Sequence, residues 1–352
     1  MESPCLTSDC FETDSGDAVA FCHRRGWTDG LPVVPPTAER IGEMLAAIGL
    51  RPDAVITRIE ERQADITAEK AAANAVMAGC RPEYMPVVVA ALEALGDPQW
   101  GFHGPATSTG GAGVFMLVNG PAARQLNVNC GESLFGPGWR ANATIGRAIR
   151  LIMRNVTGAL PGKLDRSTFG HHGKYTFCIA ENEADSPWPP VHVERGFRAE
   201  QSAVTVLAAL APQQVVNELT QNAEAVLHTM CAHMQISAGT GFNTEYVLVF
   251  AQEHMNILLR ENWSKDDIRC FCHENSGSSR ARLKQLNILP GPVLLGDETE
   301  MVPLVPTPGD FMVVAAGGPV AGFSAFIPGW GDVGWSRSVT REIKWPPAAV
   351  AP

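Results

Sequence analysis

The feature that most constrains the fold is a pair of strand-like segments that occurs twice at nearly the same spacing. The apolar stretches Val114–Val118 and Val247–Ala251 begin 133 residues apart. The stretches Tyr175–Ala180 and Phe311–Ala315 begin 136 residues apart. Solenoid repeats have periods of roughly 20–50 residues, so an offset of this length instead indicates a duplicated unit of domain size.

Helical and strand-like segments alternate around these four stretches. Thr67–Gly79 begins with a residue that caps helices and ends with glycine, which predicts a helix with both boundaries defined. We therefore predict an α/β fold of two tandem strand-helix repeats packed about a pseudo-two-fold axis, with a ligand cleft where they meet. Further expected elements are helices at Asp17–Arg25, Ala38–Ile48 (capped by Thr37), Pro86–Leu95, Asn142–Asn155, Val215–Met234 and from Lys265 (capped by Ser264), strands at Ala54–Ile59 and Val204–Leu210, and glycine-rich links at Ser108–Gly113 and Ser237–Gly241.

A proline-rich segment, Trp27–Thr37, precedes the repeats. Its prolines fix φ and remove backbone donors, which predicts an extended strap over the body. The strap is interpreted as structural, with an active-site lid as the alternative. The expected division is residues 1–50 for the lead, strap and first helices, 51–198 for the first repeat, 199–335 for the second and 336–352 for a C-terminal tail.

Composition restricts the class of partner. The formal net charge of −10 and the absence of clustered Lys and Arg argue against nucleic-acid binding and favour a small-molecule substrate. The apolar runs are shorter than the roughly 20 residues that span a bilayer, so no membrane partner is expected. The acidic N-terminus lacks the pattern of a secretory signal and the nine cysteines form no disulfide spacing, so we expect a cytoplasmic protein with reduced thiols.

The two copies differ at the ends of their strands, where function is expected. Copy one has Asn119-Gly120-Pro121 where copy two has Gln252-Glu253-His254. At the other strand end, copy one has Glu181-Asn182-Glu183 where copy two has Ala316-Gly317-Gly318. We predict that Glu181 and Glu183 act as acid and base, assisted by His254. The alternative is that they are solvated carboxylates in a turn.

The loop that precedes the helix at Asn142–Asn155 holds further candidates. Cys130 is a candidate nucleophile if the helix N-terminus lowers its pKa, and a core-filling thiol otherwise. Arg140 and its neighbour Arg147 carry guanidinium groups that bind carboxylates. The residues expected to bind substrate are Asn119, Asn129, Arg140, Asn142, Asn182, Ser108 and Gly110.

Three histidines are candidate metal ligands. His171 and His172 precede the strand at Tyr175–Ala180, and His103 precedes the first glycine-rich link. Imidazole is a common ligand of divalent metals, and His171 is also a candidate catalytic base. Adjacent histidines fit no standard zinc spacing, so a surface turn remains the alternative.

Three segments carry a resemblance to an uncharacterised bacterial family. They are TDGLPVVPPT at Thr28–Thr37, ANATIGR at Ala141–Arg147 and GKYTFCIAENE at Gly173–Glu183. The resemblance covers most of the chain and implies no defined activity. It also implies an association of relatives with short thiol or selenol proteins that bear a U/C-G-S-C motif, which this sequence does not contain.

These observations predict an enzyme that acts on a small polar organic molecule by acid–base hydrolysis or elimination, with a divalent metal as one form of assistance. A hydrolase or lyase forming a homo-oligomer is expected. The alternative is a non-catalytic subunit that supports a thiol or selenol redox partner, with the proline strap as the docking element.

Overall fold

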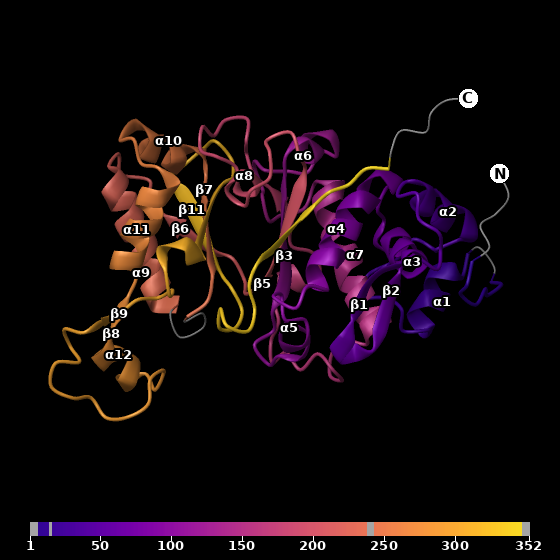
Figure 1. The fold of residues 1–352 in the computed structure, drawn as a ribbon, viewed down its shortest axis with the longest axis horizontal. Helices are drawn as coiled ribbons and strands as arrows, with labels where there is room; N and C mark the ends of the chain where they lie inside the picture. The colour runs from indigo at the N-terminus through magenta and orange to yellow at the C-terminus, as the bar shows by residue number, and fades with distance from the viewer. Residues whose placement is uncertain (1–5, 14–15, 238–242, 347–352) are drawn as a thin grey trace.

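The computed structural model describes residues 6–13, 16–237 and 243–346, which form a mixed α/β fold (Figure 1). Most of the glycine-rich link predicted at Ser237–Gly241 lies outside the described residues. The helices are α1 Ala18–Arg24, α2 Ala38–Ala46, α3 Ala68–Ala78, α4 Met85–Leu95, α5 His103–Thr107, α6 Pro121–Gln125, α7 Arg140–Thr157, α8 Val191–Glu194, α9 Ala223–Ser237, α10 Gln252–Arg260, α11 Lys265–Asn275 and α12 Arg280–Gln285. The strands are β1 Val55–Ile59, β2 Ala64–Thr67, β3 Gly113–Asn119, β4 Cys178–Ala180, β5 Ala203–Ala209, β6 Gln213–Val216, β7 Tyr246–Phe250, β8 Ser278–Ser279, β9 Met301–Val302, β10 Phe311–Ala315, β11 Phe323–Pro328 and β12 Val339–Glu342.

Two four-stranded sheets form the centre of the molecule. The first has the order β12-β5-β3-β4 and the second has the order β6-β11-β7-β10. In each sheet the last pair is parallel and the other two pairs are antiparallel. The strand β6 follows β5 in the sequence but joins the second sheet, and β12 follows β11 but joins the first. Figure 1 shows the yellow C-terminal segment crossing from one half of the molecule to the other.

The strands alternate between two buried faces. In β3, Phe115 and Leu117 belong to a cluster shared with Val247 and Val249 of β7, whereas Met116 belongs to a different cluster. Alternate side chains of a strand point to opposite faces, so the first cluster lies between the two sheets. The helices α4 and α7 cover the outer face of the first sheet, with α3 packed against α7, and α9, α10 and α11 cover the outer face of the second. The order of the layers is therefore helix, sheet, sheet, helix.

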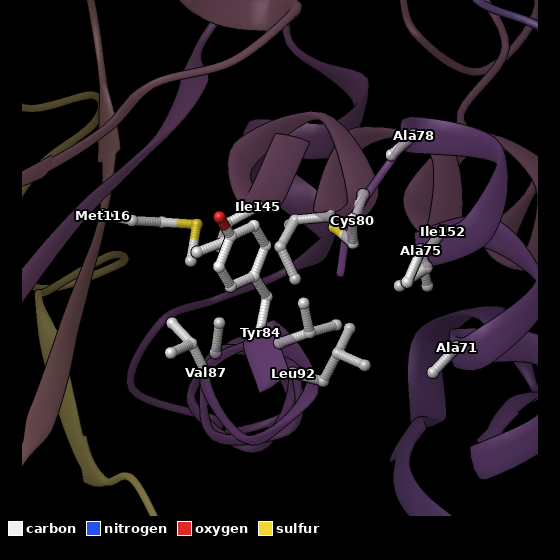
Figure 2. Close-up of a cluster of buried hydrophobic side chains, with 14 of the residues drawn as sticks. Ala71, Ala75, Ala78, Cys80, Tyr84, Val87, Leu92, Met116, Ile145 and Ile152 are labelled. Carbon is white, nitrogen blue, oxygen red and sulfur yellow. The ribbon is translucent and has the colours of Figure 1, made fainter. Parts of the chain in front are cut away.

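The helical layer over the first sheet packs through small and medium side chains. Figure 2 shows Met116, Ile145 and Val87 gathered around the ring of Tyr84, all of them buried. The helix α3 presents a run of buried alanines to α7, which lets the two helix backbones approach closely. Buried side chains of these helices therefore pack against the outer side of β3.

Several local predictions are confirmed. The hydroxyl of Thr67 accepts a hydrogen bond from Lys70 N at the start of α3, and Gly79 ends this helix with φ of +91°. Thr37 caps α2 in the same way, and Ser264 caps α11 through a capping box with Asp267. These residues fix the helix boundaries by local hydrogen bonds, which is why the sequence alone locates them.

Other local predictions are wrong. The segment Val215–Met234 is not one helix, because Gln213–Val216 forms the edge strand β6 and α9 begins only at Ala223. The strand at Tyr175–Ala180 is limited to β4, Cys178–Ala180. The expected division after residue 198 is not a division between the sheets, because β5 hydrogen-bonds to β3 of the first sheet.

The proline-rich strap is held against α7. Arg147 donates two hydrogen bonds of 2.8 Å to the carboxylate of Asp29 and a third to the carbonyl of Pro32. Burial alone would raise the pKa of Asp29, but Arg147 reverses this and holds it below the ordinary value. Arg147 therefore anchors the strap, and its guanidinium is not free for a substrate carboxylate.

We expect Leu117→Ala to lower the free energy of unfolding by about 2–5 kcal/mol, because it leaves a cavity between the two sheets. Urea unfolding followed by circular dichroism measures the change. The matched control is Leu295→Ala, at a fully exposed position, which should change stability by less than about 0.5 kcal/mol. Equal stabilities for the two variants would contradict the layered arrangement.

Candidate functional site

The fold brings Glu181 into an ion pair that uses both of its oxygens. Lys265 Nζ at the start of α11 lies 3.0 Å from Glu181 Oε1, and both side chains are almost fully buried. Glu181 Oε2 accepts hydrogen bonds from Asn119 Nδ2 and from Val191 N at 2.7 and 2.8 Å. Both oxygens of Glu181 are therefore occupied, one by the ammonium group of Lys265 and the other by two N–H donors, which leaves this carboxylate closed to a substrate.

Glu183 lies beside Glu181 but is only partly buried. Its Oε1 accepts hydrogen bonds from Asn119 Nδ2 at 3.0 Å and from Gly120 N at 2.7 Å. The fully buried ring of His192 lies 3.9 Å from the same oxygen. The structure therefore brings together the two predicted glutamates and Asn119, with His192 as a neighbour that the sequence did not indicate.

The loop before α7 is built on a pair of asparagines. Asn142 Oδ1 accepts a hydrogen bond from Asn129 N, and Asn142 Nδ2 donates to the carbonyls of Asn129 and Cys178. Asn129 Nδ2 in turn donates to the carbonyl of Glu132 at 2.9 Å. Both amides, predicted to bind substrate, therefore shape the loop instead.

Cys130 lies in the same loop but is not activated. Burial raises the pKa of its thiol, and the carboxylates of Asp185 and Glu183 raise it further against the effect of a backbone hydrogen bond. The thiol is therefore protonated at neutral pH and is a weak nucleophile. The Cys130 carbonyl accepts a hydrogen bond from Gly317 N at 2.8 Å, which ties this loop to the end of β10.

The remaining predicted binding residues make local contacts. Arg140 donates from Nε to the Gly79 carbonyl, and Asn182 donates from Nδ2 to Asp185. Ser108 Oγ accepts hydrogen bonds from Gly110 N and from Trp330 Nε1, so this glycine-rich link packs against an indole ring. None of these contacts places a side chain beside the glutamates, apart from the adjacent Asn182.

The histidines predicted as metal ligands do not form one site. His103 and His172 are exposed, whereas His171 Nε2 donates to the Ala209 carbonyl and its Nδ1 accepts from Gly173 N. Burial lowers the pKa of His171, so its ring is neutral at neutral pH. Among the described residues, no three His, Cys, Asp or Glu side chains are grouped so that they could hold a metal ion.

His254 forms a buried pair with a serine of β11. Its Nδ1 lies 2.7 Å from Ser324 Oγ, and its Nε2 lies 3.2 Å from the Asn217 carbonyl. A carbonyl only accepts, so Nε2 carries the proton and Nδ1 accepts the hydroxyl proton of Ser324. Burial lowers the pKa of His254, although the Asn217 carbonyl and Glu253 oppose it, so the ring is neutral at neutral pH.

A cleft of about 570 Å³ lies between the half of the molecule built on the first sheet and the half built on the second. It opens at the carboxyl ends of β7 and β10, where the chain continues as Ala251 and as Ala316-Gly317-Gly318. The facing wall is the loop Glu132–Gly136 from the first half. The lining is completed by Pro212, Gln214, Val249, Val320 and Phe323–Ala325.

Glycines at the end of β10 bring the walls of this cleft close together. A Cβ atom on Gly318 would lie 2.7 Å from Glu132 Cγ, and one on Gly317 would lie 2.8 Å from Ala251 Cβ. Gly317 also has φ of +116°, which other residues rarely adopt. The exposed Glu132 is the only ionisable side chain in the lining.

A second hollow of about 690 Å³ lies along α10. It is lined by Gln221, Glu253, Asn256, Leu259, Arg260 and Pro319. All but Gln221 and Pro319 belong to α10 itself, so this hollow is a depression along one helix rather than a cleft between the halves. We therefore place the candidate site in the cleft beside Gly318.

Comparison with protein-family models, curated proteins and solved structures finds no match for this chain. No helix in the described part of the chain is long and apolar enough to cross a membrane. The arguments on function therefore rest on the site itself.

Sequence analysis does not indicate Glu132 as a candidate, although it lies in the loop that contains Cys130 and Asn129. The available signal was the glycine pair Gly317-Gly318 that follows the strand Phe311–Ala315. Which side chain would lie opposite these glycines depends on how the two halves pack. No local pattern around Glu132 contains that information.

We expect Lys265→Met to lower the free energy of unfolding by about 3–5 kcal/mol, because Glu181 would remain buried without a counter-charge. Urea unfolding measures the loss. Arg51→Met is the control, since it breaks the exposed pair with Asp53 and should cost less than about 1 kcal/mol. Similar losses in the two variants would show that the Lys265 pair is not buried in solution.

We expect the stability of the protein to fall as the pH is lowered from about 6.5, the ordinary pKa of histidine, because the unfolded chain then binds protons that neutral His254 does not. The slope contributed by one histidine is at most about 1.4 kcal/mol per pH unit. His254→Gln should make the dependence shallower, leaving the contribution of His171, which has the same sign. Unfolding free energies measured between pH 5 and 7.5 with an unchanged slope would contradict this.

Proposed function

We propose that this protein is an enzyme that converts a small organic molecule by acid–base chemistry in the cleft between the halves, with Glu132 as the acid–base residue. The observation that carries the proposal is the position of Glu132, the only ionisable side chain in the lining, against Gly318. Hydrolysis and elimination both require a group that takes up or gives a proton at the reacting centre.

The surroundings of Glu132 suit this role better than those of Glu181 and Glu183. Among the described residues, Glu132 makes no ion pair, whereas Glu181 is paired with Lys265. Both glutamates predicted from the sequence accept hydrogen bonds from Asn119. The carboxylate of Glu132 is exposed in a cleft with apolar walls, so it is accessible to a bound molecule.

The pair formed by His254 and Ser324 is assigned a positioning role. The hydrogen bonds of His254 join the first turn of α10 to β11 and to the Asn217 carbonyl. Ala251, which precedes α10, lines the cleft and lacks a side-chain cap. The pair therefore supports the wall of the cleft to which Ala251 belongs.

We also infer that the two sheets derive from one duplicated unit related by a pseudo-two-fold axis. Support comes from the same order and pairing directions in β4-β3-β5 and β10-β7-β11, with β3 and β7 beginning 133 residues apart and β4 and β10 also 133 apart. After β4 the first copy carries Glu181, whose carboxylate forms an ion pair with Lys265. The second copy has Gly317 and Gly318 at the cleft. The asymmetry supports one open site per chain.

The alternative function, a supporting subunit for a thiol or selenol protein, stays a prediction. Its docking element, the proline-rich strap, is already bound to Arg147 of the same chain. The assistance of a divalent metal and the homo-oligomeric state likewise stay predictions.

We expect Glu132→Gln to reduce turnover about 10²–10⁴-fold, because the amide cannot exchange a proton at the reacting centre. The experiment incubates the protein with a pooled extract of small polar metabolites and follows their consumption by mass spectrometry. A compound consumed by the wild-type protein and spared by the variant supports the proposal.

The matched control is Glu253→Gln, which removes the same charge from a residue that does not line the cleft and should keep wild-type turnover. A second variant, Gly318→Val, keeps Glu132 but places a side chain against its Cγ atom, and should also be inactive. The proposal is wrong if no compound is consumed, or if Glu132→Gln consumes the same compound at the wild-type rate.

A further inference from the structure

We propose that the ligand of the cleft is an organic cation, a compound with an ammonium group attached to an apolar body. The inference names the substrate class of the site described above and rests on the proposed function for its biological meaning. Binding of such a cation can be measured without turnover, so the two proposals are tested separately.

The charged side chains in the lining of the cleft favour a cation over an anion. The sixteen lining residues include one carboxylate, Glu132, and no Lys, Arg or His. A phosphate or a dicarboxylate would find no basic side chain to neutralise it there. An ammonium group, in contrast, can pair with Glu132, which makes no ion pair among the described residues.

The apolar side chains in the lining of the cleft favour a ligand with an apolar body. The lining includes five large apolar side chains, those of Leu134, Phe135, Val249, Val320 and Phe323. Apolar walls favour an apolar body, and an aromatic ring is an apolar group that also attracts cations. A strongly hydrated polar molecule, such as a sugar, would leave most of its hydrogen bonds unmade.

The net charge of the whole molecule also favours a cation, through its long-range electrostatic potential. The formal net charge is −10, so the average potential around the protein attracts cations and repels anions. Because Glu132 is exposed, its attraction is screened by salt. Affinity for the cation should therefore fall as the ionic strength rises, whereas affinity for a neutral analogue should not.

The experiment compares three probes of nearly equal shape, benzylammonium, benzyl alcohol and phenylacetate, by NMR titration of the wild-type protein. We expect benzylammonium to bind about two- to fivefold more tightly than benzyl alcohol, the range of an exposed ion pair, and phenylacetate to bind more weakly than both. Backbone resonances of Gly317 and Gly318 should shift with benzylammonium.

The control variants locate the effect. Glu132→Gln should remove the preference for benzylammonium over benzyl alcohol while leaving the affinity for the alcohol within about twofold, and Glu253→Gln should keep the preference. The inference is overturned if phenylacetate binds best, if no probe shifts the glycine resonances, or if the preference survives in Glu132→Gln. Preference for the cation without any turnover would refute the proposed enzyme and leave the cation site standing.

Discussion

The rest of the structure depends on the packing of two sheets face to face through alternate residues of their strands. Both faces of β3 and β7 are buried, one against the other sheet and one against helices, so each strand must be apolar throughout. This constraint leaves polar side chains only at the strand ends. It also places the ends of β4 and β10 side by side, where Asn182 N donates to the Ala315 carbonyl and Gly317 N to the Cys130 carbonyl.

The ends of β4 and β10 differ in the side chains that lie beside them. On the first sheet, Glu181 attracts Lys265 from α11 of the other half, and the pair is sealed by Asn119. On the second sheet, the glycines that follow β10 offer nothing to pair with and leave space that the loop at Glu132 only partly covers. A buried ion pair thus joins the halves on one side, and a cleft remains on the other.

The sequence predicts the parts of this fold that are determined locally. The strand Val114–Val118 and the helix boundaries at Thr67 and Gly79 follow from apolar runs and capping residues. The edge strand β6, with two exposed glutamines, has no such signal and forms because β11 supplies hydrogen-bond partners from far along the chain. The position of Glu181 at a strand end follows from a local pattern and was predictable. Its ion pair with Lys265 depends on a distant part of the chain and was not.

A catalytic role is therefore more easily assigned by setting aside the side chains that already have a partner than by residue type. A glutamate at a strand end is a reasonable candidate base until a lysine is found 3.0 Å away, after which its charge serves to hold two layers together. Glu132 belongs to a residue type found mostly on surfaces, yet it borders a space bounded by two glycines. What distinguishes it is the absence of a partner within the described part of the chain together with a neighbouring volume large enough for a small ligand. Those two conditions arise only from the packing of the two halves, and they make an attraction for a positively charged group the natural property of the site.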